Sequence, residues 1–301
     1  MSNHQVLLAA HRTWRVTPAV RYTVFHKPVV VGNRRSLRTG ETGPLVLVIV
    51  RSVVFNVLFY VNLLVHFLAA IPTLVLPRRA IVEVAKFWAR VNLVLLRYIC
   101  GTKVAFRGLD HIPHGAVLVA SKHQSLWETF ALLLVFDDPA YILKRELMFI
   151  PFFGWYAWKA GMIPVHRGRG SLALAEMTAG ARAELARGRQ IVIFPEGTRR
   201  TPGAEPSYKF GVVHLYAETG VACVPLALNS GLFWPRRSFR RYPGTIVVEA
   251  LDPISPGLDK DAFAARLRQT VEDATARLVA EGERELAARG VTRDAPAPAR
   301  R

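Results

Sequence analysis

The chain has 301 residues, a formal net charge of +18 and 51% hydrophobic residues, so it can bury a substantial core in one large domain or two small ones. Its two cysteines, Cys100 and Cys223, stand far apart without metal-ligand spacing, which argues against a disulfide framework or a zinc module and favours a reducing, cytosol-facing location. The basicity requires an anionic partner, and nucleic acid, acidic lipid headgroups and phosphorylated substrates all qualify. Because a mean hydropathy of +0.21 accompanies the charge, an anionic bilayer is favoured over nucleic acid.

Residues 1–43 are predicted to form a basic N-terminal arm. Against the single acid Glu41 this segment carries Arg12, Arg15, Arg21, Lys27, Arg34, Arg35 and Arg38. It lacks the early apolar run and the small-residue cleavage site of a secretory signal, which argues against export. An Arg-rich organelle transit peptide stays an alternative for this arm.

Residues 44–100 are predicted to form a helical segment embedded in a membrane. No Asp, Glu, Lys or Arg occurs over 52–76, which is long enough to span a bilayer. Several polar side chains and Pro72 interrupt this stretch, and a second apolar stretch follows over 87–98. Three arrangements therefore stay open: a full span, a helical hairpin dipped into one leaflet, and a buried helix of a soluble protein.

Residues 101–257 show short apolar runs that alternate with helical stretches. Strands are predicted over 116–120, 191–194, 222–228 and 245–250, and helices over 125–136, 172–186 and 212–219. This alternation predicts an α/β fold with a mixed, mostly parallel central sheet flanked by helices. Residues 258–301 are expected to form a C-terminal amphipathic helix, over 262–289, and a flexible tail.

A histidine and an acid stand five positions apart, directly after the strand predicted over 116–120. The segment reads Lys122-His-Gln-Ser-Leu-Trp-Glu128, at the kind of strand end where α/β sheets place ligands. Five steps along one regular helix turn by roughly 140°, so His123 must precede the helix if the pair is to touch. Ser125 and Glu128 match the Ser-x-x-Glu capping box, which predicts a helix that begins at Ser125. Glu128 therefore has two open interpretations, a helix cap and a carboxylate that orients a catalytic imidazole.

Three basic loops follow in the sequence. Two of them occupy 143–147 and 161–169. The third, Pro195-Glu-Gly-Thr-Arg-Arg200, comes directly after a predicted strand. Arginine holds phosphate with paired hydrogen bonds, and glycine lets backbone N–H groups approach it, although an ordinary solvated turn would have the same composition. The apolar, aromatic run over 148–158 fits either an acyl-chain groove, a lipid contact or core packing.

Four of these segments, in this order, resemble the 1-acylglycerol-3-phosphate acyltransferase family. They read Lys-His-Gln-Ser-Leu-Trp-Glu-Thr over 122–129, Leu-Lys-Arg-Glu-Leu over 143–147, Phe-Pro-Glu-Gly-Thr-Arg over 194–199 and Val-Pro-Leu-Ala-Leu-Asn over 224–229. The resemblance covers about residues 85–255. It implies transfer of a fatty acyl group from acyl-CoA or acyl carrier protein to the free hydroxyl of lysophosphatidic acid, which gives phosphatidic acid without a covalent acyl-enzyme.

The resemblance also implies a role for particular residues of this chain. His123 would be the general base and Glu128 its orienting carboxylate. The implied substrate-binding residues for the phosphate and the acceptor loop are Lys144, Arg167, Glu196, Gly197, Thr198 and Arg199, and Pro225 belongs to the last segment. No metal ion and no organic cofactor are expected.

Two positions depart from the family pattern. The general pattern is His-x4-Asp, whereas this chain has Glu128, whose carboxylate must reach the imidazole of His123 with one more methylene group. An apolar residue and Asp often precede the second-loop arginine, but here Val165 and His166 precede Arg167. The second departure bears on the identity of the acceptor and not on the type of reaction.

Other functions remain as alternatives. The same His–Glu pair would serve an acyltransferase that acts on another lysolipid or on glycerol 3-phosphate. A non-catalytic basic protein that binds anionic membrane lipids would be indifferent to His123. Nucleic acid is not expected as a partner because no recognition helix or RNA-binding motif is evident, and a serine hydrolase would need a Gly-x-Ser-x-Gly elbow that the sequence lacks. We expect a membrane protein with its catalytic domain on the cytoplasmic side, in the inner membrane of a bacterium.

Overall fold

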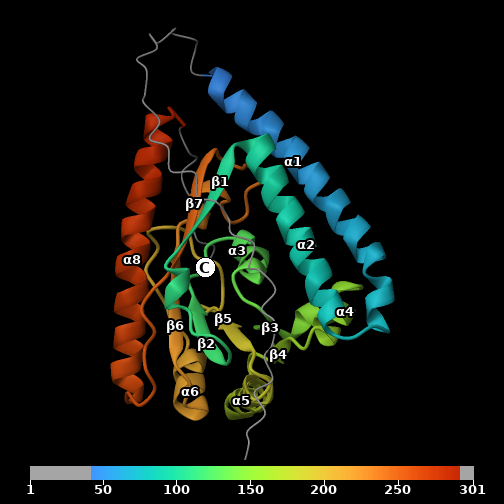
Figure 1. Cartoon of the computed structure of the whole chain (residues 1–301). Helices are drawn as coiled ribbons and strands as arrows, with labels where there is room; N and C mark the ends of the chain where they lie inside the picture. The colour runs from blue at the N-terminus through green and yellow to red at the C-terminus, as the bar shows by residue number, and fades with distance from the viewer. Residues whose placement is uncertain (1–41, 292–301) are drawn as a thin grey trace, which may run out of the picture. The chain divides into compact units, whose positions relative to one another are not determined.

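The computed structural model describes residues 42–291 of the chain, which lie in one compact unit. All but the last two residues of the predicted basic arm, and the predicted tail beyond Val291, lie outside the described residues. In the described part, seven strands form one sheet in the order β1-β7-β6-β2-β5-β3-β4 (Figure 1). The strands are β1 (Thr102–Arg107), β2 (Val117–Ser121), β3 (Pro139–Lys144), β4 (Ile163–Val165), β5 (Gln190–Ile193), β6 (Cys223–Leu228) and β7 (Gly244–Ala250). All neighbouring strands run parallel except β6 and β7, so the predicted mixed, mostly parallel sheet is confirmed.

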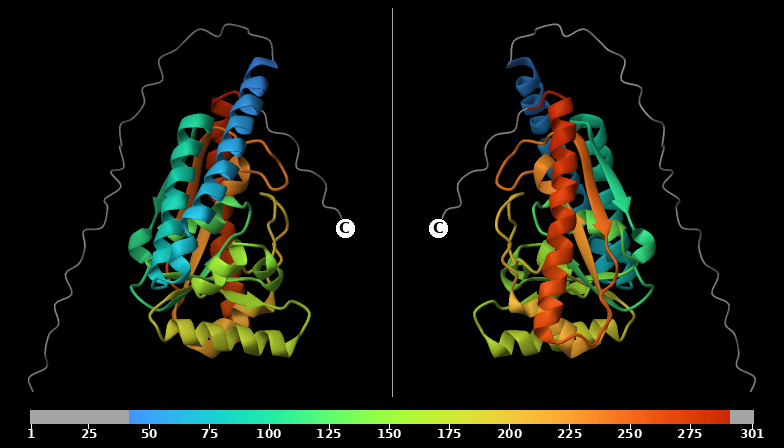
Figure 2. Two further views of the ribbon diagram at one scale, coloured as in Figure 1. Left: turned by 90° about the vertical axis from the view of Figure 1, so that its right-hand side faces the viewer. Right: turned by 90° about the vertical axis from the view of Figure 1, so that its left-hand side faces the viewer.

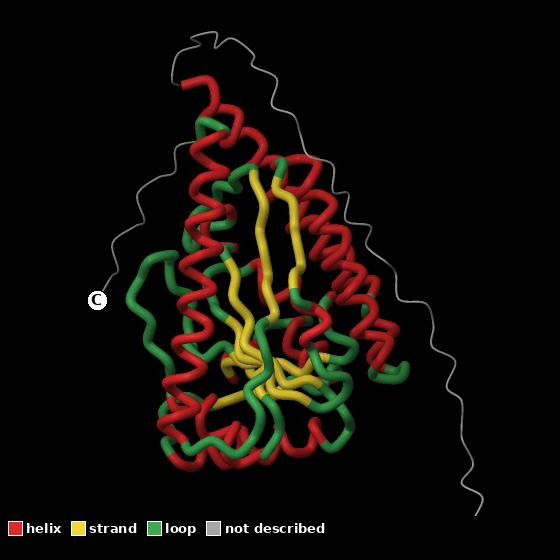
Figure 3. Tube along the Cα trace, turned by 60° about the vertical axis from the view of Figure 1, so that its left-hand side comes forward, coloured by secondary structure: helices red, strands yellow, loops and turns green. Residues whose placement is uncertain are grey.

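Helices cover both faces of the sheet. They are α1 (Thr42–Ala69), α2 (Arg79–Leu95), α3 (Trp127–Ala131), α4 (Phe153–Lys159), α5 (Ser171–Leu185), α6 (Phe210–Thr219), α7 (Ser230–Phe233) and α8 (Lys260–Ala288). Alternate residues of β2 face opposite sides, as a strand requires. Val117 and Val119 pack in a cluster with residues of α1, α2 and α3, whereas Leu118 and Ala120 pack with residues of α5, α6 and α8. The sheet is therefore the middle layer between two sets of helices (Figure 3).

The sequence located the four strands β2, β5, β6 and β7 to within one residue at either end. It missed β1, β3 and β4. β4 has only three residues, β3 begins with a proline, and β1 carries Lys103 and Arg107 on its exposed face. These strands lie at or beside the sheet edges, where burial is too incomplete to produce a continuous apolar run.

The first two helices pack side by side (Figures 1 and 2). By length and composition, Leu45–Ala69 is the one helix in the described part that is suited to cross a membrane, and 22% of its most apolar window is buried. The buried rings of Phe55 and Phe59 pack against Trp234, while the opposite side of α1 exposes valines and leucines. The helix ends at Ala69, before the turn that contains Pro72, so the apolar stretch is not one continuous helix.

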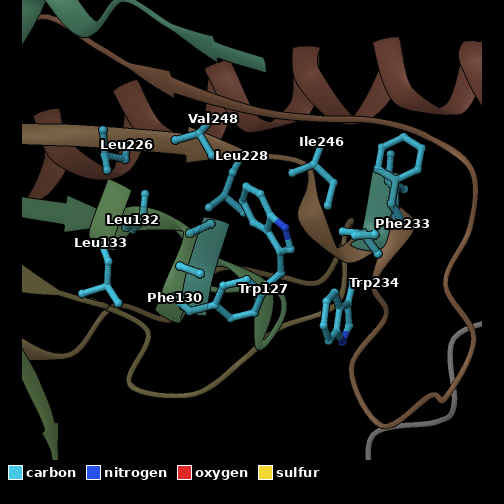
Figure 4. Packing of buried hydrophobic residues seen from close by; sticks show 14 of the residues in the cluster. Trp127, Phe130, Leu132, Leu133, Leu226, Leu228, Phe233, Trp234, Ile246 and Val248 are labelled. Carbon is cyan, nitrogen blue, oxygen red and sulfur yellow. The ribbon is translucent and has the colours of Figure 1, made fainter. Parts of the chain in front are cut away.

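The short helix α3 is held firmly in the core. Its Trp127 is fully buried, in one cluster with Leu228 and Val248 of the sheet, and Phe130 packs edge-on against Trp234 (Figure 4). The helix begins at Trp127, two residues later than predicted, and continues as a 3-10 turn over Leu132–Leu134. This packing fixes the position of the residues that connect β2 to α3.

Candidate active site

The site lies at the carboxyl ends of two neighbouring parallel strands. β2 ends at Ser121 and β5 ends at Ile193, so His123 and Phe194 follow the two strands at the same edge of the sheet. The ring of His123 stacks on the ring of Phe194, with 4.1 Å between centroids and 21° between planes. The Phe194 ring therefore covers one face of the imidazole.

His123 and Glu128 are in direct contact. Glu128 Oε1 lies 2.9 Å from His123 Nδ1, and the exposed fractions of the two side chains are 0% for Glu128 and 14% for His123. An ionised carboxylate can only accept, so the Nδ1 atom carries the proton in this bond and Nε2 keeps its lone pair. The contact shows that the longer glutamate reaches the imidazole from its place in α3.

Glu128 also accepts backbone hydrogen bonds at the start of α3, so the contact with His123 and the predicted capping contact occur in the same side chain. Its Oε1 atom accepts from the backbone N–H groups of Gln124 and Ser125, at 2.7 and 2.6 Å. Ser125 Oγ accepts in return from the N–H of Trp127, at 3.1 Å, rather than from the N–H three residues on as a standard capping box would require. Ser230 Oγ donates to Glu128 Oε2 at 2.8 Å. Three further hydrogen bonds thus hold both oxygens of the carboxylate that contacts His123.

A buried ionic network lies beneath His123. Lys122 Nζ lies 2.9 Å from Glu196 Oε1 and 2.8 Å from Glu272 Oε1, and Tyr208 donates its hydroxyl proton to the same Glu272 oxygen at 2.9 Å. Glu196 Oε2 accepts from the backbone N–H of His123 at 3.1 Å. Burial raises the pKa of Glu196, although Lys122 and the His123 N–H oppose that rise. The network connects α8 to the backbone of the histidine.

Glu196, which the resemblance assigns to the acceptor loop, has a buried side chain within the ionic network. Its side chain is fully buried and bonds to Lys122 and to the His123 backbone, whereas Thr198 is exposed and Gly197 is partly exposed. Gly197 has a φ of +64°, and a Cβ atom there would lie 3.7 Å from Arg167 Nη2. The turn thus brings the Arg167 guanidinium close to the loop that holds Arg199.

The three predicted phosphate-binding cations lie at exposed or partly exposed positions. Arg167 is exposed, Arg199 is partly buried, and Lys144 Nζ lies 3.3 Å from Glu146 Oε1 at an exposed position. The fold brings Arg167 next to the Pro195–Arg200 turn, whereas Lys144 contacts Glu146, two residues away in its own segment. The fold thus brings Arg167 and Arg199 into neighbouring positions, and their predicted role in phosphate binding stays a prediction.

Sequence reasoning missed several residues that support this site. Ser230, Glu272 and Tyr208 are far from His123 in the sequence and carry no motif, so nothing in the sequence singled them out. Lys122 belongs to the Lys122–Glu128 segment, where the sequence alone indicates no role for it. Its burial between two acids, with 4% of its side chain exposed, is the structural signal that the sequence could not supply.

The apolar run over 148–158 lies mostly on the surface. Phe149 is 74% exposed, Trp155 53% and Trp158 74%, so core packing is the wrong interpretation for these three rings. Tyr156 is buried, and its hydroxyl donates to the carbonyl of Phe67 near the end of α1 at 2.5 Å. The run thus packs beside the end of the first helix and leaves these three rings exposed.

Comparison with known proteins gives a consistent result. The Acyltransferase family model matches residues 103–229. A 1-acyl-sn-glycerol-3-phosphate acyltransferase of Pseudomonas aeruginosa is 38% identical over 175 residues, which are 58% of this chain and 68% of that protein. The human 1-acyl-sn-glycerol-3-phosphate acyltransferase alpha is 31% identical over 189 residues, 60% of this chain and 67% of that protein. The crystal structure of the 1-acyl-sn-glycerophosphate acyltransferase PlsC from Thermotoga maritima superposes with a TM-score of 0.63 at 21% identity, over 76% of this chain and 97% of that one, which shows a shared fold.

Proposed function

Since the chain belongs to the family of 1-acyl-sn-glycerol-3-phosphate acyltransferases, we propose that it transfers a fatty acyl group to the free hydroxyl of 1-acylglycerol 3-phosphate and forms phosphatidic acid. The observation that carries the mechanism is the 2.9 Å contact between His123 Nδ1 and the buried Glu128 carboxylate. It leaves Nε2 as the acceptor for a proton at a strand end beside arginine-bearing loops.

In the proposed reaction, His123 Nε2 removes the proton from the acceptor hydroxyl as its oxygen attacks the thioester carbonyl carbon of the donor. The carbon–oxygen bond forms, the carbon–sulfur bond breaks, and the imidazolium returns its proton to the leaving thiolate. Glu128 stabilises the imidazolium and holds the ring in one tautomer. The donor is acyl-CoA or acyl carrier protein, and the residues supply proton transfer without an acyl-enzyme.

The acceptor phosphate is proposed to bind the basic loops through Lys144, Arg167 and Arg199, with Gly197 and Thr198 shaping the turn. Guanidinium groups bind phosphate by paired hydrogen bonds, which suits this role. The ion pair between Glu196 and Lys122 is proposed to hold this loop in place.

The apolar helix α1, which exposes valines and leucines along one side, supports association with a membrane. We propose that residues 44–100 embed the chain in the inner membrane of a bacterium, with the acyltransferase core over 101–257 on the cytoplasmic side and the helix and tail over 258–301 attached to it. The exposed rings of Trp155 and Trp158 suit the interface between lipid and water.

A panel of donors and acceptors tests the proposal. Purified protein in lipid nanodiscs would receive acyl-CoA or acyl carrier protein together with 1-acylglycerol 3-phosphate, glycerol 3-phosphate or a zwitterionic lysolipid. We expect phosphatidic acid from the first acceptor. Failure to acylate any lysolipid with either donor would contradict the proposed activity, and preference for another acceptor would correct its substrate.

A further inference from the structure

The loop between α7 and β7 contributes cations that none of the four sequence segments contains. It runs over 234–243 and holds Arg236, Arg237, Arg240 and Arg241. Arg236 Nη1 donates to the carbonyl oxygen of Arg199 at 2.5 Å. This bond places a guanidinium of the α7–β7 loop directly on the turn that follows β5.

The loop is fastened to the first helix. Arg241 donates its backbone N–H to Ser52 Oγ at 2.8 Å and its Nη2 group to Asn56 Oδ1 at 2.9 Å, and Asn56 Nδ2 donates to the carbonyl of Phe239 at 2.7 Å. The Arg241 guanidinium also lies 4.1 Å from the centroid of the Trp234 ring. The loop that carries Arg236 is therefore fixed to both the apolar helix and the core.

Arg236 belongs to a cluster of positive charge that has no carboxylate partner in the described part of the chain. We call Arg199, Arg200, Arg236 and Arg237 the arginine cluster. Within residues 42–291 no side chain of the cluster forms an ion pair with a carboxylate. Arg200 Nε is buried without a hydrogen-bond partner in the same part of the chain. Burial, followed by the nearby charges of the other three arginines, lowers the pKa of Arg236.

The arginine cluster adjoins the catalytic histidine. The backbone N–H of Arg200 donates to the carbonyl oxygen of His123 at 2.8 Å. One hydrogen bond thus connects His123 to Arg200, and another connects the adjacent Arg199 to Arg236. An anion bound by these side chains would lie beside the group that receives the acceptor proton.

We propose that Arg236 is a specificity-determining residue that, with the arginine cluster, binds the phosphate monoester of the acyl acceptor and selects it over lysolipids with zwitterionic headgroups. This inference rests on the proposed function and names a ligand outside the recognised segments. A phosphate monoester carries between one and two negative charges near neutral pH, and several guanidiniums can contact its three free oxygens. A phosphodiester with a quaternary ammonium group offers less negative charge and would bring a cation towards the cluster.

The first experiment compares wild type, Arg236→Gln and Arg236→Lys on three acceptors: 1-acylglycerol 3-phosphate, 1-acylglycerophosphocholine and phosphate-free 1-acylglycerol. Arg284→Gln on α8 is the matched control, because it removes the same charge from an exposed position outside the site. A charged hydrogen bond is worth about 1.5 to 3 kcal/mol, or roughly 10- to 100-fold. We expect Arg236→Gln to raise KM for 1-acylglycerol 3-phosphate by about that factor with a smaller change in kcat, and Arg236→Lys to recover part of the loss.

The selectivity between acceptors should change together with KM. The preference for 1-acylglycerol 3-phosphate over the other two acceptors should narrow in Arg236→Gln and stay at the wild-type value in Arg284→Gln. An equal loss on phosphate-free 1-acylglycerol, or an unchanged KM for the phosphate-bearing acceptor, would overturn the role of Arg236.

A binding measurement keeps the inference separate from the proposed reaction. We expect 1-acylglycerol 3-phosphate to raise the Tm of the wild-type protein in nanodiscs, and to raise that of a folded Arg236→Gln variant by less at equal concentration. An equal rise in both would contradict the inference even if the enzyme is active. An inactive wild type that still shows the difference would reject the proposed reaction and retain the phosphate site.

Discussion

The His123–Glu128 pair and the arginine cluster are neighbours with opposite construction. Every oxygen of Glu128 is hydrogen-bonded, its side chain is fully buried, and α3 is packed into the core. The arginine cluster is partly exposed and lacks a carboxylate partner within residues 42–291. A group that transfers a proton must keep one geometry, whereas a group that binds an anion must keep its charge available. This difference supports our proposal that the pair transfers the proton and that the cluster binds the phosphate.

The largest expected effect comes from His123→Ala. Removing the general base should lower kcat by about 10²- to 10⁴-fold, while the acceptor still binds because the arginines are unchanged. Steady-state kinetics combined with a membrane-flotation assay would measure both. Wild-type turnover in this variant would show that the pair has no part in proton transfer and would favour a basic membrane-binding protein.

A smaller effect, on the other side of the comparison, is expected from Arg167→Gln. The Arg167 guanidinium lies next to Gly197 and is exposed, so its loss should weaken acceptor binding without disturbing the core. We expect KM for 1-acylglycerol 3-phosphate to rise about tenfold, with kcat changed less than twofold. A fall in kcat at constant KM would place Arg167 with the proton-transfer group instead.

Glu272→Gln should affect His123 from a distance. Loss of this carboxylate leaves Lys122 with Glu196 alone, and Glu196 holds the His123 N–H. We expect kcat to fall by about three- to tenfold, with a shifted pH–rate profile, because the imidazole is less well positioned. Glu283→Gln, an exposed change on the same helix, should alter neither value. An unshifted profile with reduced Tm would assign Glu272 a structural role only.

Asp138→Asn should change stability and leave the chemistry intact. Burial alone would raise the pKa of Asp138, but Arg78 and Arg189 outweigh it and hold that pKa below its usual value. A lowered folded-state pKa means that the carboxylate stabilises the fold above the unfolded pKa of about 3.9 and loses this effect as the pH falls through the folded-state pKa. The group is partly exposed, and Arg189 keeps Glu184 as a partner.

We therefore expect Asp138→Asn to cost only about 1 to 2 kcal/mol at pH 7, with the difference from wild type shrinking below pH 4. Unfolding followed by circular dichroism at several pH values would measure it. A difference that grows as the pH falls would contradict the sign of the pKa shift.

The same contrast explains how far the sequence could predict the site. His123 and Glu128 are five residues apart, so a strand end followed by a helix is enough to bring them together. Glu272 and Arg236 reach the site from α8 and from the α7–β7 loop, through contacts that span 150 and 37 residues of sequence. Such contacts depend on the order of strands in the sheet, which local patterns do not specify.

The fold shows a similar division. The buried strands β2, β5 and β6 have continuous apolar runs and were predicted, whereas β1, β3 and β4 have mixed burial and were missed. The helix boundary at Trp127 was placed too early because Ser125 makes its cap bond two residues on, outside the regular helix. Local rules thus identified the well-buried strands, whereas tertiary packing determined the strands near the sheet edges and the exact ends of the elements.

The turnover of Glu128→Gln tests the pairing of the two site residues most directly. Glutamine keeps an oxygen for the backbone N–H groups of Gln124 and Ser125 and so preserves much of the cap, but it removes the charge beside the imidazole. We predict that kcat for 1-acylglycerol 3-phosphate falls by about 10²-fold while KM and the Tm of the folded variant change little. Wild-type kcat in a folded Glu128→Gln protein would contradict the account, because the carboxylate would then serve only as the helix cap.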